Sequence, residues 1–267
     1  MKAFFKNWLE FLDRDFKLSR HQVFFAVVAL LIIGLGLRCG YWMMRDRPPR
    51  DEKFYIQTVE NINNRDNNWV KKSGYVAPLM PWLAFNACKL GISAETALHT
   101  LNMGYAILWV LVMFFLCRDV FDNDKAGLLG MAFAAFNPYS VRMASQILRE
   151  PLYILIFTLS LWIAVRFIKS QGVNPLHPLL LAGLTMLVFF TRYEGIEISL
   201  FLPLAIAVIF MQYKWQYIRR CIYSLAIYLF TFALIVGALI NFNNTYMRNA
   251  RQKAIDYFAL FTGNKLK

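Results

Sequence analysis

The sequence has little charge, few histidines and no recognisable cysteine pattern. Of its 267 residues, only 17% are charged and 58% are hydrophobic, with three histidines and four cysteines. This balance excludes an ordinary soluble domain, in which roughly a quarter of the residues carry charge. The cysteines, Cys39, Cys88, Cys117 and Cys221, show neither paired nor metal-type spacing. We therefore expect buried free thiols.

The N-terminus lacks the pattern of a cleavable signal peptide. Residues 1–21 mix charges with aromatic residues, and the first apolar block comes late, is long and has no small-residue cleavage site. We expect residues 1–21 to form a cytoplasmic segment that lies along a membrane surface.

The chain does contain long apolar blocks, and a helix needs about 20 residues to cross a membrane. These blocks predict an all-α, polytopic membrane protein. About seven transmembrane helices are expected, at residues 23–44, 97–117, 127–147, 152–167, 179–190, 196–213 and 222–242. Asn137-Pro138 should kink the third span, and Arg38 should snorkel from the end of the first.

Two shorter helices are expected in the first outer loop, residues 45–96. Residues 51–63 carry Phe54, Val59 and Ile62 at helical spacing, and residues 78–90 are apolar but too short to span. Both segments are typical of helices that lie in the membrane interface.

The net charge of +13 would suggest nucleic acid as the partner of a soluble protein. Here the basic residues lie between the apolar blocks, so lipid headgroups and anionic substrates are the expected partners, and nucleic acid is not. The basic residues also favour a cytoplasmic N-terminus. In that orientation the short inner loops hold seven (Arg118, Lys125, Arg166, Lys169, Lys214, Arg219 and Arg220) and the short outer loops three (Arg142, Arg149 and Arg192).

Three charged clusters then share the outer side. The first is Asp51-Glu52 among Arg45, Arg47, Arg50 and Lys53; the second is Arg149-Glu150-Pro151; the third is Thr191-Arg192-Tyr193-Glu194-Gly195. A site that binds a phosphate and deprotonates a hydroxyl needs both signs of charge close together. Each cluster also has a structural interpretation, as a helix start with an acidic first turn or as a hairpin turn with an internal Arg–Glu pair.

The order of these features resembles the GT-C superfamily of polyprenyl-phosphate-sugar glycosyltransferases. Within it, the chain is most similar to the branch of protein O-mannosyltransferases and the lipid A aminoarabinose transferase. The matching elements are Asp51-Glu52 with Tyr55, Tyr75 to Trp82 at a Lys-Pro-Pro-Leu-type element, Glu150, Thr191 to Gly195, and Tyr246-Met247-Arg248-Asn249. Val76 and Ala77 replace the lysine and first proline of the second element, which leaves Lys71 or Lys72 as stand-ins for the family's phosphate-binding lysine.

The resemblance implies transfer of a hexosyl or pentosyl group from a polyprenyl-phosphate donor to an acceptor hydroxyl, with inversion. The acceptor would be a glycan, a lipid or a protein. Asp51 would act as general base, with Glu52 as a second catalytic carboxylate. The donor phosphate would be bound by Arg149, Arg192, Arg248, Lys72 and Tyr55, while Glu150 and Glu194 would support the acceptor or a metal. No organic cofactor is expected, and a divalent cation on Asp51 and Glu150 stays open.

The resemblance also sets the expected organisation and location. Residues 22–242 would form the transmembrane glycosyltransferase-like module, and residues 243–267 an outer tail. The protein would be multi-pass in a bacterial inner membrane, with its active face in the periplasm. Relatives continue with further spans, so the chain matches the conserved N-terminal half, and a partner subunit could supply the other half.

Two other functions compete with this one. The first is a truncated or inactive GT-C-like module that binds a polyprenyl lipid or a partner protein. The second is a transporter or flippase, which would need charges near the middle of several spans and an internal repeat. The sequence shows neither, so the transporter is the least favoured.

Overall fold

Helices provide all the regular structure in the part of the chain that the structure describes. The computed structural model describes residues 18–45, 50–64, 77–170, 174, 176–192, 195–210, 222–223, 225–231 and 233. The helices are α2 (Arg20–Met44), α3 (Arg50–Asn63), α5 (Leu79–Cys88), α6 (Ala94–Phe121), α7 (Asp124–Phe136), α8 (Pro138–Ala144), α9 (Glu150–Lys169), α10 (Leu176–Thr191) and α11 (Ile196–Phe210). The all-α prediction is confirmed for these residues.

Three of these helices, α2, α6 and α9, are long and apolar enough to cross a membrane. At 16 and 15 residues, α10 and α11 rise only about 24 Å or less, short of the roughly 30 Å of a hydrocarbon core. The expected span at 222–242 lies largely outside the described residues. The same holds for most of the N-terminal segment 1–21 and for the whole tail 243–267.

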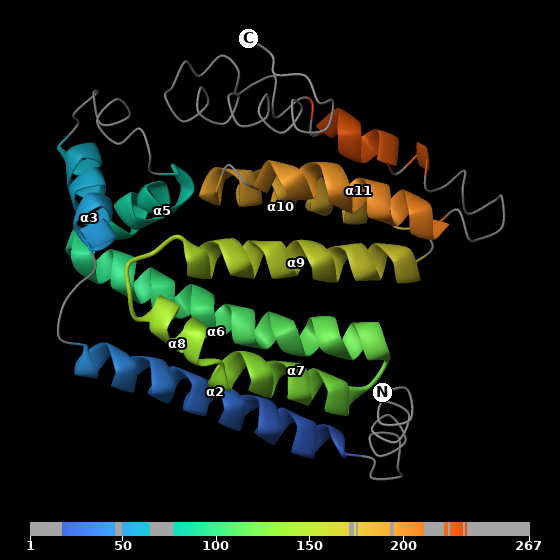
Figure 1. Cartoon of the computed structure of the whole chain (residues 1–267), viewed down its shortest axis with the longest axis horizontal. Coiled ribbons are helices and arrows are strands. Elements are labelled where there is room, and N and C mark those ends of the chain that lie inside the picture. Colours follow the sequence, from blue (N-terminus) through green and yellow to red (C-terminus); the bar gives the residue numbers. More distant parts are fainter. Residues whose placement is uncertain are drawn as a thin grey trace, which may run out of the picture.

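The long helices pack side by side, with α6 at the centre (Figure 1). On one side α6 contacts α7, which α2 covers; on the other it contacts α9, which α10 and α11 cover. A small residue at position 130 allows α6 and α7 to pack closely, because a methyl group at Gly130 would lie 2.3 Å from Cys117 Sγ. Polar caps start the helices, including Ser19 for α2 and Ser93 for α6.

The kink expected at Asn137-Pro138 is a complete break between α7 and α8. Asn137 is extended and its side chain accepts a hydrogen bond from the Ser140 N–H, which starts α8 with Pro138 in its first turn. Because proline has no N–H, the carbonyl of Ala134 loses its helical donor. The segment expected to span at 127–147 is therefore two helices of 13 and 7 residues.

Arg38 does not snorkel, and that prediction is wrong. Its side chain is fully buried and turns toward the end of α7. The guanidinium donates to the carbonyls of Gly34 (2.9 Å), Ala134 (3.2 Å) and Ala135 (3.2 Å) and to Ser140 Oγ (2.9 Å). The break in the helix leaves carbonyls without donors, and a cation at a helix C-terminus satisfies them.

Helices α3 and α5 lie at one end of the bundle, which we call the α3 end (Figure 1). The buried face of α3 is formed by Glu52, Tyr55, Thr58 and Val59, which pack toward α5 and α6. Phe54, expected on the apolar face with Val59, is instead 61% exposed. The face that α3 buries is therefore polar at its N-terminal turn and apolar further along.

Candidate functional site

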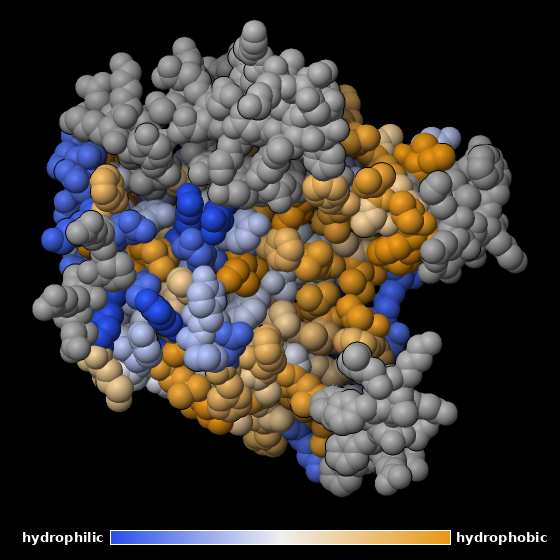
Figure 2. All heavy atoms as spheres, viewed as in Figure 1, coloured by the Kyte–Doolittle hydropathy of each residue, from blue (hydrophilic) through white to orange (hydrophobic). Residues whose placement is uncertain are grey.

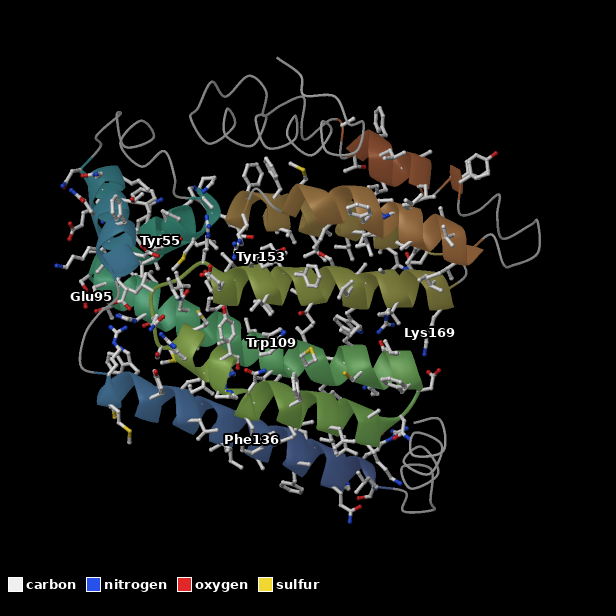
Figure 3. All side chains as sticks on the ribbon, viewed as in Figure 1. Tyr55, Glu95, Trp109, Phe136, Tyr153 and Lys169 are labelled. Carbon is white, nitrogen blue, oxygen red and sulfur yellow. The ribbon has the colours of Figure 1, made fainter. Side chains whose placement is uncertain are left out.

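Polar groups from five segments gather at the α3 end of the bundle. They come from the end of α2, the first turns of α3 and α6, the connection from α8 to α9, and the end of α10. Figure 3 shows Tyr55 and Tyr153 at this end, with Lys169 at the opposite end of α9. In Figure 2 hydrophilic residues concentrate on the side that carries α3, and hydrophobic residues cover much of α10 and α11.

The connection from α8 to α9 is held by three side chains, Arg45, Glu52 and Asn102, which we call the loop brace. They come from the C-cap of α2, from α3 and from α6, and they bind consecutive backbone groups of residues 145–148. Arg45 donates to the Ser145 carbonyl (2.8 Å), Asn102 Nδ2 donates to the carbonyls of Gln146 (2.6 Å) and Leu148 (2.9 Å), and the Ile147 N–H donates to Glu52 Oε1 (2.9 Å).

Glu52 lies in an enclosed ion pair, where sequence reasoning expected a catalytic carboxylate. Its side chain is 2% exposed, and both carboxylate oxygens accept hydrogen bonds from Arg45, whose side chain is 16% exposed. The same carboxylate accepts the Ile147 N–H. With its oxygens engaged in this way, Glu52 has a structural role in the described site, and Asp51 is the carboxylate of the pair that stays accessible.

His99 completes the surroundings of this ion pair. Its Nε2 lies 3.2 Å from Arg45 Nη2, and its ring lies 5.8 Å from that of Trp42. A guanidinium can only donate, so Nε2 accepts and the neutral ring carries its proton on Nδ1. Nothing in the sequence brings His99 to Arg45, because the two residues lie 54 positions apart.

Tyr55 is the centre of the charged residues at the α3 end. The pKa of its hydroxyl is raised to about 12, chiefly by burial; the charge of Arg149 opposes the rise, those of Glu150 and Asp51 contribute to it, and that of Arg192 opposes it. Four charged residues from α3, from the start of α9 and from the end of α10 are thus close enough to act on one hydroxyl. The hydroxyl stays protonated at neutral pH and can donate a hydrogen bond.

A second Arg–Glu pair, formed by Arg192 and Glu150, lies beside Tyr55. Arg192 Nη1 donates to Glu150 Oε1 at 3.2 Å, and the two side chains are 28% and 23% exposed. The Arg192 guanidinium also lies over the ring of Tyr153, 5.5 Å from its centroid. Glu150 Oε2 is buried and accepts no hydrogen bond from any described residue.

The turn after α10 brings Arg192 to the site. The Gly195 N–H donates to the Arg192 carbonyl at 2.9 Å. A methyl group at Gly195 would lie 2.7 Å from the backbone carbon of Val188. The close return of the chain onto α10 therefore requires glycine at this position. The third charged cluster, residues 191–195, thus forms a turn as its structural interpretation expects, and the same turn places Arg192 beside Glu150.

The remaining predicted site residues lie outside the part of the chain that the structure describes. These are Lys72, its alternative Lys71, Glu194 and Arg248. Within the described residues, no three His, Cys, Asp or Glu side chains are grouped to hold a metal ion. A cation shared by Asp51 and Glu150 alone stays a prediction.

Sequence reasoning missed Asn102, Tyr153 and the partnership of Arg45 with His99. An asparagine in the third turn of an apolar helix was the available signal, because polar residues within spanning segments are uncommon and bind other groups. No protein-family model matches the chain, and a search of curated proteins finds no match.

Proposed function

We propose that the chain is a membrane glycosyltransferase that moves a sugar from a polyprenyl-phosphate donor to an acceptor hydroxyl. The observation that carries this proposal is the ion pair of Arg192 at the end of α10 with Glu150 at the start of α9, together with Arg149 and Asp51, whose charges act on the buried hydroxyl of Tyr55. The reaction needs compensating positive charge for the leaving phosphate and a base for the acceptor. Side chains of both kinds, from separate segments, meet at one end of an apolar bundle.

Each residue has a proposed role in this reaction. Asp51, which is exposed on α3, accepts the proton of the attacking hydroxyl. Arg149 and Arg192 bind the donor phosphate, because a guanidinium matches two phosphate oxygens at once. Tyr55 donates a hydrogen bond to the same phosphate. Glu150 orients Arg192.

The proposal also includes the number of membrane-crossing helices and their orientation, which go beyond what the three long apolar helices show. In this arrangement about seven helices cross the bilayer, α3 and α5 lie in the interface, and the N-terminus is cytoplasmic. The α3 end then faces the periplasm of a bacterial inner membrane, where the donor headgroup is presented. Cysteines introduced at Glu60 and Lys125, in a background without native cysteines, test this. We expect a membrane-impermeant thiol reagent to label only Glu60→Cys in intact spheroplasts.

Transfer itself is tested with purified protein in lipid nanodiscs, using a panel of polyprenyl-phosphate sugars and following release of the polyprenyl phosphate. Wild-type protein should consume one donor of the panel when a hydroxyl acceptor is present. Asp51→Asn should lower the rate about 10²- to 10⁴-fold, which is the usual contribution of a general base. Asp124→Asn, at the opposite end of the bundle, is the control and should leave the rate unchanged. Normal transfer by Asp51→Asn would remove Asp51 from the role of base.

A second function is a module that binds polyprenyl phosphate without transferring sugar. Arg149 and Arg192 favour it, because guanidinium groups can bind a phosphate without any base. Binding of polyprenyl phosphate that depends on Arg192, with no turnover of any donor in the panel, would support this function over the first.

A further inference from the structure

The most heavily bonded short segment at the α3 end is the connection that leads into Arg149 and Glu150. Four consecutive residues, 145–148, each have a backbone group bonded by the loop brace, which is defined above as Arg45, Glu52 and Asn102. Asn102 is fully buried and Glu52 almost so. Backbone groups of a connection are ordinarily satisfied by water or neighbouring turns. Here they are bonded by side chains from three other elements.

We propose that Arg45, Glu52 and Asn102 are positioning residues that fix where Arg149 and Glu150 stand relative to Asp51 and Tyr55. The next two residues after the braced segment are Arg149, the N-cap of α9, and Glu150, which begins α9 with Pro151 in its first turn. Glu52 adjoins Asp51 and lies one helical turn before Tyr55 on α3. One carboxylate therefore ties the α3 side of the site to the side formed by the connection. The catalytic consequence of the brace rests on the glycosyltransferase function proposed above.

The brace has a direction, and this separates it from a simple ion pair. The Ser145 carbonyl needs a donor and the Ile147 N–H needs an acceptor, so the chemistry at positions 45 and 52 is not interchangeable. Arginine at position 52 cannot accept from Ile147, and glutamate at position 45 cannot donate to Ser145. Swapping the two residues therefore keeps an ion pair between positions 45 and 52 but leaves the Ser145 carbonyl and the Ile147 N–H without their bonds.

The test uses full-length protein in nanodiscs and two readouts: hydrogen exchange of residues 145–150 and transfer kinetics. Asn102→Leu keeps the number and branching of the side-chain heavy atoms and removes both hydrogen bonds to the connection. Its matched control is Thr158→Val, which removes an equally buried bond to Trp109 Nε1 (3.0 Å) away from the connection. We expect Asn102→Leu to speed exchange at 145–150 about tenfold. Its kcat should fall about 100-fold, the effect of a displacement of roughly 1 Å at a site. Thr158→Val should change neither readout.

In the double variant Arg45→Glu with Glu52→Arg, the backbone amides of residues 145–150 should exchange their hydrogens rapidly. Glu52→Gln keeps an acceptor for the Ile147 N–H, so hydrogen exchange in this segment should be slower than in the double variant. If Asn102→Leu does not fold, these two variants carry the test. The proposal would be overturned by any of three results. These are unchanged hydrogen exchange in Asn102→Leu, an equal loss of kcat in Thr158→Val, or wild-type hydrogen exchange and kcat in the double variant Arg45→Glu with Glu52→Arg. If the wild-type protein transfers no sugar, the proposed function fails, and the exchange readout alone decides whether the brace holds the connection.

Discussion

Two Arg–Glu pairs lie at the same end of this molecule and have different surroundings. Arg45 and Glu52 are nearly enclosed, and both oxygens of Glu52 are bonded to Arg45. Arg192 and Glu150 are each about a quarter exposed, and they share one bond in which Glu150 Oε2 takes no part. The same two residue types thus form an enclosed ion pair at Arg45 and Glu52 and a partly exposed ion pair at Arg192 and Glu150. Accessibility, rather than residue type, separates scaffold from candidate site.

The largest expected effect is on stability, and it distinguishes the two glutamates. Glu52→Ala leaves Arg45 unpaired and the Ile147 N–H unbonded, so we expect it to lower the free energy of unfolding by about 3–5 kcal/mol. Glu150→Ala should lower it by about 1 kcal/mol or less, because its pair is open to solvent. Denaturant unfolding in detergent, followed by tryptophan fluorescence, measures both. Similar losses in the two variants would mean that enclosure does not separate the pairs.

A smaller effect concerns the anion site, and it tests the open pair alone. Arg192→Lys keeps the charge and loses the planar fork that binds two phosphate oxygens. We expect the affinity for polyprenyl phosphate to fall about tenfold, equivalent to about 1.4 kcal/mol, with an unchanged unfolding midpoint. Arg166→Lys, an exposed arginine at the opposite end of α9, is the control and should bind normally. An unchanged affinity in Arg192→Lys would remove Arg192 from the phosphate site.

The smallest effect is at Tyr55, between the two pairs. Its pKa is raised from 10.0 to about 12, chiefly by burial. Below pH 10 the hydroxyl is protonated whether the chain is folded or unfolded, so Tyr55→Phe should reduce transfer about fivefold equally from pH 6 to 9. Above pH 10 the unfolded chain releases the proton first, so stability contributed by Tyr55 declines as pH rises from 10 to 12. The unfolding midpoint of Tyr55→Phe should therefore fall less than that of wild type over this range. A transfer deficit that varies between pH 6 and 9 would contradict this assignment.

Much of the helical framework could be predicted from the sequence, because long apolar blocks and the polar segments that separate them are local signals. The helices at 20–44, 50–63, 94–121 and 150–169 lie close to where hydropathy and spacing indicate. The break at Asn137-Pro138 was predicted in position and underestimated in extent. Arg38 was assigned to the wrong environment, because three of its four acceptors lie on α7 and α8, about a hundred residues away in the chain.

The candidate site could be predicted only in outline. Three charged clusters were found by composition, and each contributes to the charges that act on Tyr55, through Asp51, through Arg149 and Glu150, and through Arg192. The distinct roles of Asp51 and Glu52 could not be found in this way. Neighbouring residues on a helix point about 100° apart, so one faces the core and the other faces out. Which one is buried depends on where Arg45 and the connection at 145–148 lie, and that is tertiary information.

The buried guanidinium of Arg38 has a consequence for how the chain is made. Its acceptors on residues 134, 135 and 140 are synthesised about a hundred residues after it, a delay of roughly 5–20 s at ordinary elongation rates. During that interval the first hydrophobic helix carries a charge with no bonding partner among these groups, which lipid tails do not solvate. We therefore expect α2 to reach its final position only after α7 and α8 have been made.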